Sequence, residues 1–237
     1  MRNPIIVALD VPTADRALEL ATQLAPVVGA VKVGKELFTS AGPEIVRRLR
    51  ATGAAVFLDL KFHDIPNTVA RAVEAAVRLD VQMLTVHTTG GLVMLQAAEQ
   101  AAQTEARRLG RTPLLVLGVT VLTSLDDAAL AELGVNGTAA EQVARLGRLA
   151  AKAGLRGLVC SPLEISLLRA ALPAEMQLVT PGIRPPGAGQ DDQRRTLTPC
   201  EALAAGANWL VIGRPICAVP DPRAAAEQIL AGLEAPR

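Results

Sequence analysis

The chain has 237 residues, of which 50% are hydrophobic, and its formal net charge is +1. This balance is typical of a compact soluble domain, and α/β barrels reach this length undivided, so we expect one domain over residues 1–237. Aromatic residues make up only 2% of the chain. Together with the lack of a basic stripe, this low content argues against a nucleic-acid-binding surface.

The N-terminal sequence MRNPIIVALD lacks the long apolar segment of a secretory leader, and no stretch approaches the roughly 20 apolar residues of a membrane span. We therefore expect a cytoplasmic protein with no membrane partner. The three cysteines are far apart and show no C-x-x-C spacing. This pattern predicts neither a disulfide framework nor a zinc site.

Short apolar runs alternate along the chain with longer runs of helical period, which is the pattern of repeated βα units. The strand candidates, in chain order, are IIVALD, AVKVG, AVFLDL, MLTVH, LLVLGV, GLVCS, LVTPG and WLVIG. The helical stretches between them include residues 14–24, 44–51, 69–79, 92–109, 139–153 and 223–233. About eight such units predict an α/β fold of the (β/α)8 TIM barrel type. A doubly wound open sheet is the alternative, but no G-x-G-x-x-G follows the first strand.

Ionisable residues fall where several of these apolar strands end. Asp10 follows the first strand, Lys32 interrupts the second, and Asp59 and Lys61 end the third. Active sites of barrels form at the carboxyl ends of the strands. Asp59 and Lys61 are two residues apart, so regular alternation places both side chains on one face, toward the barrel mouth. Alternating acids and lysines lower the pKa of the carboxyl groups, raise that of the ammonium groups, and offer a cationic proton donor.

A second group of residues predicts an anion site near the end of the chain. In barrels a phosphate commonly binds at the loops after strands seven and eight, against the first turn of a short helix. The chain offers TPGIRP and VIGRPI at these places. Gly213 allows a close backbone approach, Arg214 provides a bidentate fork, and Pro215 suits a first helical turn. Arg184 and Gln193 lie in the loop over residues 180–193, which is expected to cover the phosphate.

With these motifs in order, the sequence resembles the orotidine 5′-phosphate decarboxylase family. The resemblance rests on ALD, VKVG, DLKFHDIPNTV, VTVLTS, TPGIRP, DDQRR and VIGRPI, of which HDIPNT and the paired GIRP and GRPI motifs are the most specific. It implies decarboxylation of orotidine 5′-phosphate to UMP and carbon dioxide, the last step of UMP synthesis. It also implies a homodimer that needs no metal or organic cofactor.

The resemblance further implies a role for each matching residue. Lys61 would protonate the pyrimidine carbon, Asp59 would face the departing carboxylate, and Lys32 would position Asp59 and the ribose. Asp64 and Thr68 would complete the site of the partner subunit. The remaining substrate contacts would come from Asp10 to the ribose, Thr123 to the base, and Arg184, Gln193, Gly213 and Arg214 to the phosphate or its covering loop.

Two other functions are compatible with parts of this pattern. D-x-K-x-x-D also occurs in metal-dependent aldolases or decarboxylases that act on sugar phosphates, where the carboxylates would bind Mg²⁺. Lys32 argues against that reading, because its ammonium group would compete with the cation. A phosphate-binding barrel without catalysis is the third possibility, since the fold alone does not establish a reaction.

Overall fold

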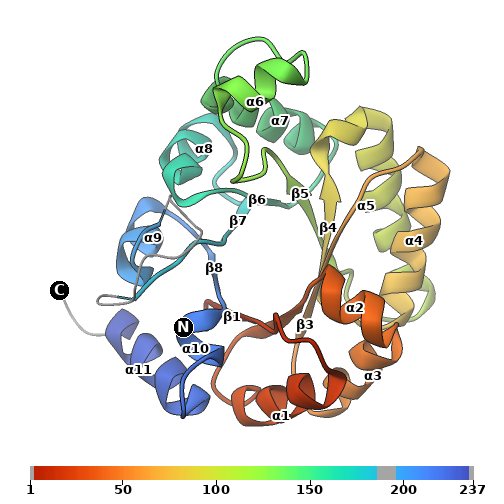
Figure 1. The fold of residues 1–237 in the computed structure, drawn as a ribbon. Helices are drawn as coiled ribbons and strands as arrows, with labels where there is room; N and C mark the ends of the chain where they lie inside the picture. The colour runs from red at the N-terminus through yellow and green to blue at the C-terminus, as the bar shows by residue number, and fades with distance from the viewer. Residues whose placement is uncertain (1–2, 186–195, 235–237) are drawn as a thin grey trace.

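The computed structural model describes residues 3–185 and 196–234, and eight parallel strands within them form a closed barrel in sequence order (Figure 1). The strands are β1 Ile5–Ala8, β2 Ala30–Val33, β3 Val56–Phe62, β4 Met83–His87, β5 Leu115–Val119, β6 Gly157–Val159, β7 Gln177–Thr180 and β8 Trp209–Ile212. Strand β8 pairs with β1 and closes the sheet. The prediction of a (β/α)8 barrel is therefore confirmed, and the open sheet is excluded.

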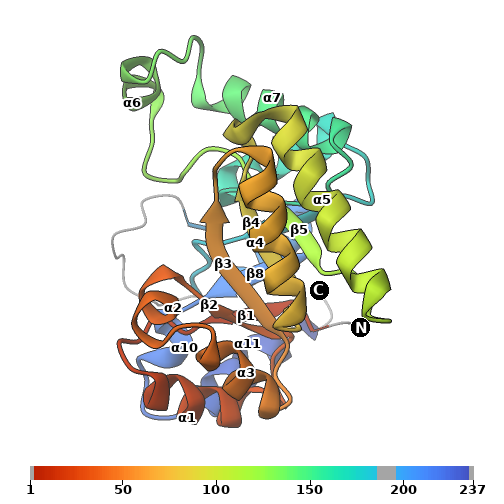
Figure 2. The ribbon, with the colours of Figure 1, turned by 90° about the vertical axis from the view of Figure 1, so that its right-hand side faces the viewer.

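A ring of helices surrounds the barrel, as Figure 1 shows. The α-helices are α1 Ala14–Leu24, α2 Lys35–Ala41, α3 Glu44–Ala51, α4 Pro66–Arg78, α5 Gly91–Arg108, α6 Asp127–Glu132, α7 Ala139–Lys152, α8 Ile165–Ala171, α9 Pro199–Ala205, α10 Arg214–Cys217 and α11 Pro222–Glu234. Two 3-10 turns, η1 Thr88–Gly90 and η2 Pro162–Glu164, precede α5 and α8. Helices α4 and α5 lie side by side, whereas α6 projects away from the barrel wall (Figure 2).

Local sequence explains where several helices begin. The Thr13 side chain accepts a hydrogen bond from the backbone N–H of Arg16 and caps α1. Thr138 and Glu141 form a reciprocal capping box at the start of α7. These side chains satisfy backbone N–H groups that have no partner within a helix. Helix α4 begins at Pro66, three residues before the expected start, because proline fits the first turn, where no N–H is needed.

The six helices expected from periodicity are present, whereas α2, α6, α8 and α9 were not among them. Each of these four has seven residues or fewer. Two turns contain too few apolar positions to reveal a period of 3.6 residues. Short helices of this kind are consequently visible only in the tertiary structure.

The apolar core has two layers that the strand pleat separates. The inner layer fills the barrel and includes Ile6, Phe57, Met83, Leu117 and Trp209. The outer layer lies between the strands and the helices, and Leu58 and Leu84 belong to it. Alternate residues of one strand therefore enter different layers.

Among the helices that the structure describes, none combines the length and the apolar character that a membrane span requires.

Candidate functional site

A cavity of about 550 Å³ opens at the carboxyl ends of the strands and brings together most of the predicted site residues. Eight of the eleven line it: Asp10, Lys32, Asp59, Lys61, Thr123, Arg184, Gly213 and Arg214. Asp64 and Thr68 are exposed and lie outside this lining. Gln193 lies outside the described residues.

Four charged side chains form a continuous chain across the cavity. The Lys32 Nζ atom lies 3.1 Å from Asp10 Oδ1 and 3.8 Å from Asp59 Oδ2. The other oxygen of Asp59, Oδ1, accepts a hydrogen bond from Lys61 Nζ at 2.7 Å. Acid and base therefore alternate in the order Asp10, Lys32, Asp59, Lys61, which places each lysine beside an opposite charge.

Asp59 lies at the centre of this array and is largely buried. Its side chain is 14% exposed, and those of Lys32 and Lys61 are 11% and 23% exposed. Burial by itself raises the pKa of the Asp59 carboxyl group, but the charges of Lys32 and Lys61 and hydrogen bonds from Lys61 and Thr85 outweigh burial and lower the pKa. The carboxylate is therefore ionised at neutral pH.

The strand that carries Asp59 and Lys61 is irregular, which corrects the premise of regular alternation. The register between β3 and β4 shifts between Leu58 and Phe62, and Lys61 has a left-handed backbone with φ of 54°. Leu60 and Phe62 still pack against the outer core layer. The two charged side chains do meet, but the Lys61 position depends on this local kink and not on a simple two-residue repeat.

Thr85 of β4 contacts both residues and was not among the sequence predictions. It is fully buried and shares the inward face of its strand with Met83. Its Oγ1 donates a hydrogen bond to Asp59 Oδ1 and accepts one from the backbone N–H of Lys61, each at 2.9 Å. A hydroxyl at an inward position of the apolar run MLTVH was the available sequence signal.

The predicted phosphate residues lie on the same cavity, after β7 and β8. Gly213 precedes α10, and Pro215 occupies its first turn, as the sequence predicts. A methyl group added at Gly213 would lie 3.5 Å from the Ala8 side chain and 3.8 Å from Asp10 Oδ2. Arg184 lines the cavity from the segment after β7. Two arginines therefore line the same cavity as the charge array.

Apolar residues complete the wall between the two charged regions. Phe57, Val121, Leu122 and Val159 line the cavity together with Cys160. Burial raises the pKa of the Cys160 thiol to about 12, so the thiol remains protonated and is a poor nucleophile. This wall can pack against a flat, uncharged ring.

Asp64 lies on the loop after β3, and Thr68 lies in the first turn of α4. The Asp64 Oδ1 atom accepts a hydrogen bond from the backbone N–H of Ile65 at 2.6 Å. Ile65 is 66% exposed, and so is Val93 at the start of the neighbouring helix α5. The two predicted residues thus belong to an outward surface that carries exposed apolar side chains.

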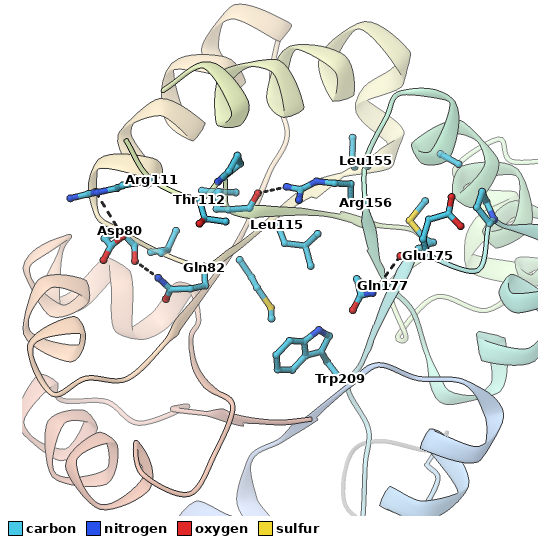
Figure 3. Close-up of a pocket in the computed structure, with 17 residues that line it drawn as sticks. Asp80, Gln82, Arg111, Thr112, Leu115, Leu155, Arg156, Glu175, Gln177 and Trp209 are labelled. Carbon is cyan, nitrogen blue, oxygen red and sulfur yellow. Dashed lines mark hydrogen bonds and ion pairs between the residues drawn. The ribbon is translucent and has the colours of Figure 1, made fainter. Parts of the chain in front are cut away.

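A larger cavity, of about 880 Å³, lies at the opposite, amino end of the strands (Figure 3). Both of its arginines donate to backbone carbonyls. Arg111 donates to the carbonyl of Val77 and lies 3.9 Å from Asp80, and Arg156 donates to the carbonyl of Leu114 at 2.7 Å. Trp209 lies below the other labelled side chains in this view and belongs to the inner core layer.

The chain is similar to known proteins over nearly its whole length. The family model described as "Orotidine 5'-phosphate decarboxylase / HUMPS family" matches residues 3–229. The chain belongs to this family. Proteins named orotidine 5′-phosphate decarboxylase from Opitutus terrae and Pseudomonas fluorescens are 54% and 56% identical to it. The alignments cover 99% and 98% of this chain and 100% and 98% of those proteins.

A solved relative agrees with the family assignment. The crystal structure of orotidine 5′-phosphate decarboxylase from Lactobacillus acidophilus superposes with a TM-score of 0.88 at 37% identity. The match covers 98% of this chain and 100% of that chain. Sequence similarity and barrel geometry therefore both match the decarboxylase family over nearly the whole chain.

Proposed function

We propose that this protein decarboxylates orotidine 5′-phosphate to UMP and carbon dioxide. The observation that carries the proposal is the alternating array in the cavity, with the Lys61 ammonium 2.7 Å from the Asp59 carboxylate. In the reaction, the bond between the ring carbon and the carboxylate breaks and leaves its electron pair on the ring. The Lys61 ammonium then donates a proton to that carbon, and solvent later restores the lysine proton.

The charges around the substrate carboxylate favour its departure as carbon dioxide. Asp59 stays ionised beside Lys61 and would face the substrate carboxylate, while Lys32 holds Asp59 from the other side. The negative charge of Asp59 disfavours a second carboxylate at the same place but does not disfavour neutral carbon dioxide. A general acid typically accelerates a reaction by about 10²–10⁴-fold. The preorganised electrostatic field and phosphate binding must supply the remaining rate acceleration.

Substrate binding would use both sides of the cavity. Arg184, Arg214 and the backbone at Gly213 are the phosphate ligands in this proposal, and Asp10 and Lys32 bind the ribose hydroxyls. Thr123 would contact the base beside the apolar wall. A phosphate held by Arg184, Arg214 and Gly213 would fix the reacting carbon next to Lys61.

The activity itself is tested with chelator present. Loss of orotidine 5′-phosphate absorbance in excess EDTA is the expected result, because the mechanism uses no metal. Within residues 3–185 and 196–234, no three His, Cys, Asp or Glu side chains are grouped to hold a metal ion. Absence of turnover, or activity on a sugar phosphate that disappears with EDTA, would overturn the proposal.

We further propose that two chains share each site. Asp64 and Thr68 are exposed outside the cavity of their own chain, next to the exposed Ile65. A two-fold interface over this surface would bury Ile65 and Val93 and bring Asp64 to the partner subunit's cavity. The carboxylate would then extend the charge array beyond Lys61.

A mixing experiment tests the shared site directly. Lys61→Ala and Asp64→Ala homodimers are each expected to be nearly inactive. After subunit exchange, each mixed dimer regains one site with both native side chains, so random mixing restores about a quarter of wild-type activity. A mixture that exchanges subunits but stays inactive, or a fully active monomer, would contradict the proposal.

A further inference from the structure

The pairing between β3 and β4 is irregular beside the charge array. Leu58 pairs with Leu84 and Phe62 pairs with Val86. Between these pairs β3 has three residues, Asp59 to Lys61, whereas β4 has only Thr85. The backbone of β3 must therefore bulge, and a bulge leaves main-chain groups without their usual ladder partners.

The side chain of Thr85 replaces one of those partners. Its Oγ1 accepts the Lys61 backbone N–H at 2.9 Å. Lys61 is a non-glycine residue in the left-handed region, with φ of 54°. Such a conformation persists only where its surroundings hold it. The threonine hydroxyl is thus a direct restraint on the backbone of the lysine.

The same hydroxyl also restrains the carboxylate. It donates its proton to Asp59 Oδ1 at 2.9 Å, the oxygen that also accepts from Lys61 Nζ at 2.7 Å. Thr85 has no solvent exposure, so water does not compete for these bonds. The one buried hydroxyl therefore donates to Asp59 and accepts from the Lys61 backbone.

We infer that Thr85 is a positioning residue of the reaction, which sets the Asp59 carboxylate and the Lys61 backbone in one fixed geometry. The inference rests on the proposed roles of these two residues. Thr85 acts through them: the hydroxyl fixes the carboxylate oxygen against which the ammonium is held. Loss of the hydroxyl removes one restraint on the Asp59 carboxylate and the acceptor that supports the kink.

Thr85→Val tests this role because valine keeps the shape and removes the hydroxyl. We expect kcat to fall about 10²-fold, since a displacement of about 1 Å in a catalytic group can have that effect. UMP binding should stay within about threefold, because Thr85 is not a ligand of the phosphate or ribose in this scheme. Thr85→Ser, which keeps a hydroxyl, should retain kcat within about fivefold of wild type.

Two further measurements separate positioning from simple support of the fold. The acid limb of the kcat profile should move to higher pH in Thr85→Val, because one bond that favours the ionised Asp59 is lost. In an Asp59→Asn background, Thr85→Val should cost less than about fivefold, since residues that act as a unit are not additive. If Thr85→Val does not fold, Thr85→Cys, a weaker hydrogen bonder, replaces it with the same expectations.

The outcomes distinguish a failure of the proposed function from a failure of the role inferred for Thr85. Wild-type protein without turnover overturns the proposed function itself. With an active wild type, the inference on Thr85 is overturned by a Thr85→Val enzyme of normal kcat, by equal losses in the serine and valine variants, or by full additivity with Asp59→Asn. Rescue by serine together with non-additivity supports it.

Discussion

The two ends of the barrel carry cavities that contain similar residue types but differ in their hydrogen bonds and ion pairs. At the carboxyl end, Lys61 and Lys32 hold Asp59, and side chains bond to side chains. At the amino end, Arg111 and Arg156 donate to backbone carbonyls that border the strands. The amino-end cavity is the larger one, at about 880 Å³ against about 550 Å³.

Cavity size and charge therefore do not identify a functional site by themselves. A cation that holds a backbone carbonyl stabilises the ends of strands, and a bound molecule would have to displace that bond. At the carboxyl end, Asp10, Lys32, Asp59 and Lys61 pair with one another around an open cavity, where they can also face a ligand. The predictions below test this contrast by changing matched residues at the two ends.

The largest effect is expected for Lys61→Ala. The general acid is lost, so kcat should fall by about 10²–10⁴-fold or more, while UMP binding persists. Steady-state kinetics and calorimetry with UMP measure the two quantities. Lys152→Ala, a lysine in the last turn of α7, is the matched control and should leave kcat unchanged. Normal turnover by Lys61→Ala would remove the lysine from the mechanism.

Arg214→Ala should have the next largest effect. A charge-assisted hydrogen bond to phosphate contributes about 1.5–3 kcal/mol, so kcat/KM should fall by about 10–10²-fold. Arg111→Ala removes an arginine from the amino-end cavity and should leave kcat/KM unchanged. Equal losses in the two variants would contradict the functional distinction between the cavities.

Arg156→Ala should affect stability and not catalysis. It removes the donors to the Leu114 carbonyl and to the buried Glu99. Loss of such bonds should lower the free energy of unfolding by about 1–2 kcal/mol. Urea denaturation measures this change, and kcat should equal the wild-type value. A drop in kcat with unchanged stability would show that the amino end contributes to the reaction.

The smallest effect concerns the pH dependence of stability. The pKa of Asp59 is lowered from its unfolded value of 3.8, so ionised Asp59 contributes stability above about pH 4 that is lost as pH falls through the folded pKa. The stability of wild type relative to Asp59→Asn should therefore decline below about pH 4 and stay level above it. Urea titrations over this range measure the difference. A decline that begins near neutrality would contradict the lowered pKa.

Much of the fold and part of the site follow from local sequence. Short apolar runs and longer runs of helical period predicted eight βα units, and Gly213 and Pro215 predicted the short helix α10. The ends of apolar strands located Asp59 and Lys61. These signals lie within one element and need no knowledge of its neighbours.

The order of elements, the family and the residue types at the carboxyl ends of the strands are thus readable from the sequence. Which of those residues touch depends on the folded barrel. Thr85 meets Asp59 across 26 positions of sequence, and Lys32 bonds to Asp10 across 22. These contacts depend on strand register and on the kink at Lys61. Register is a property of paired strands, so no single segment of the chain encodes it.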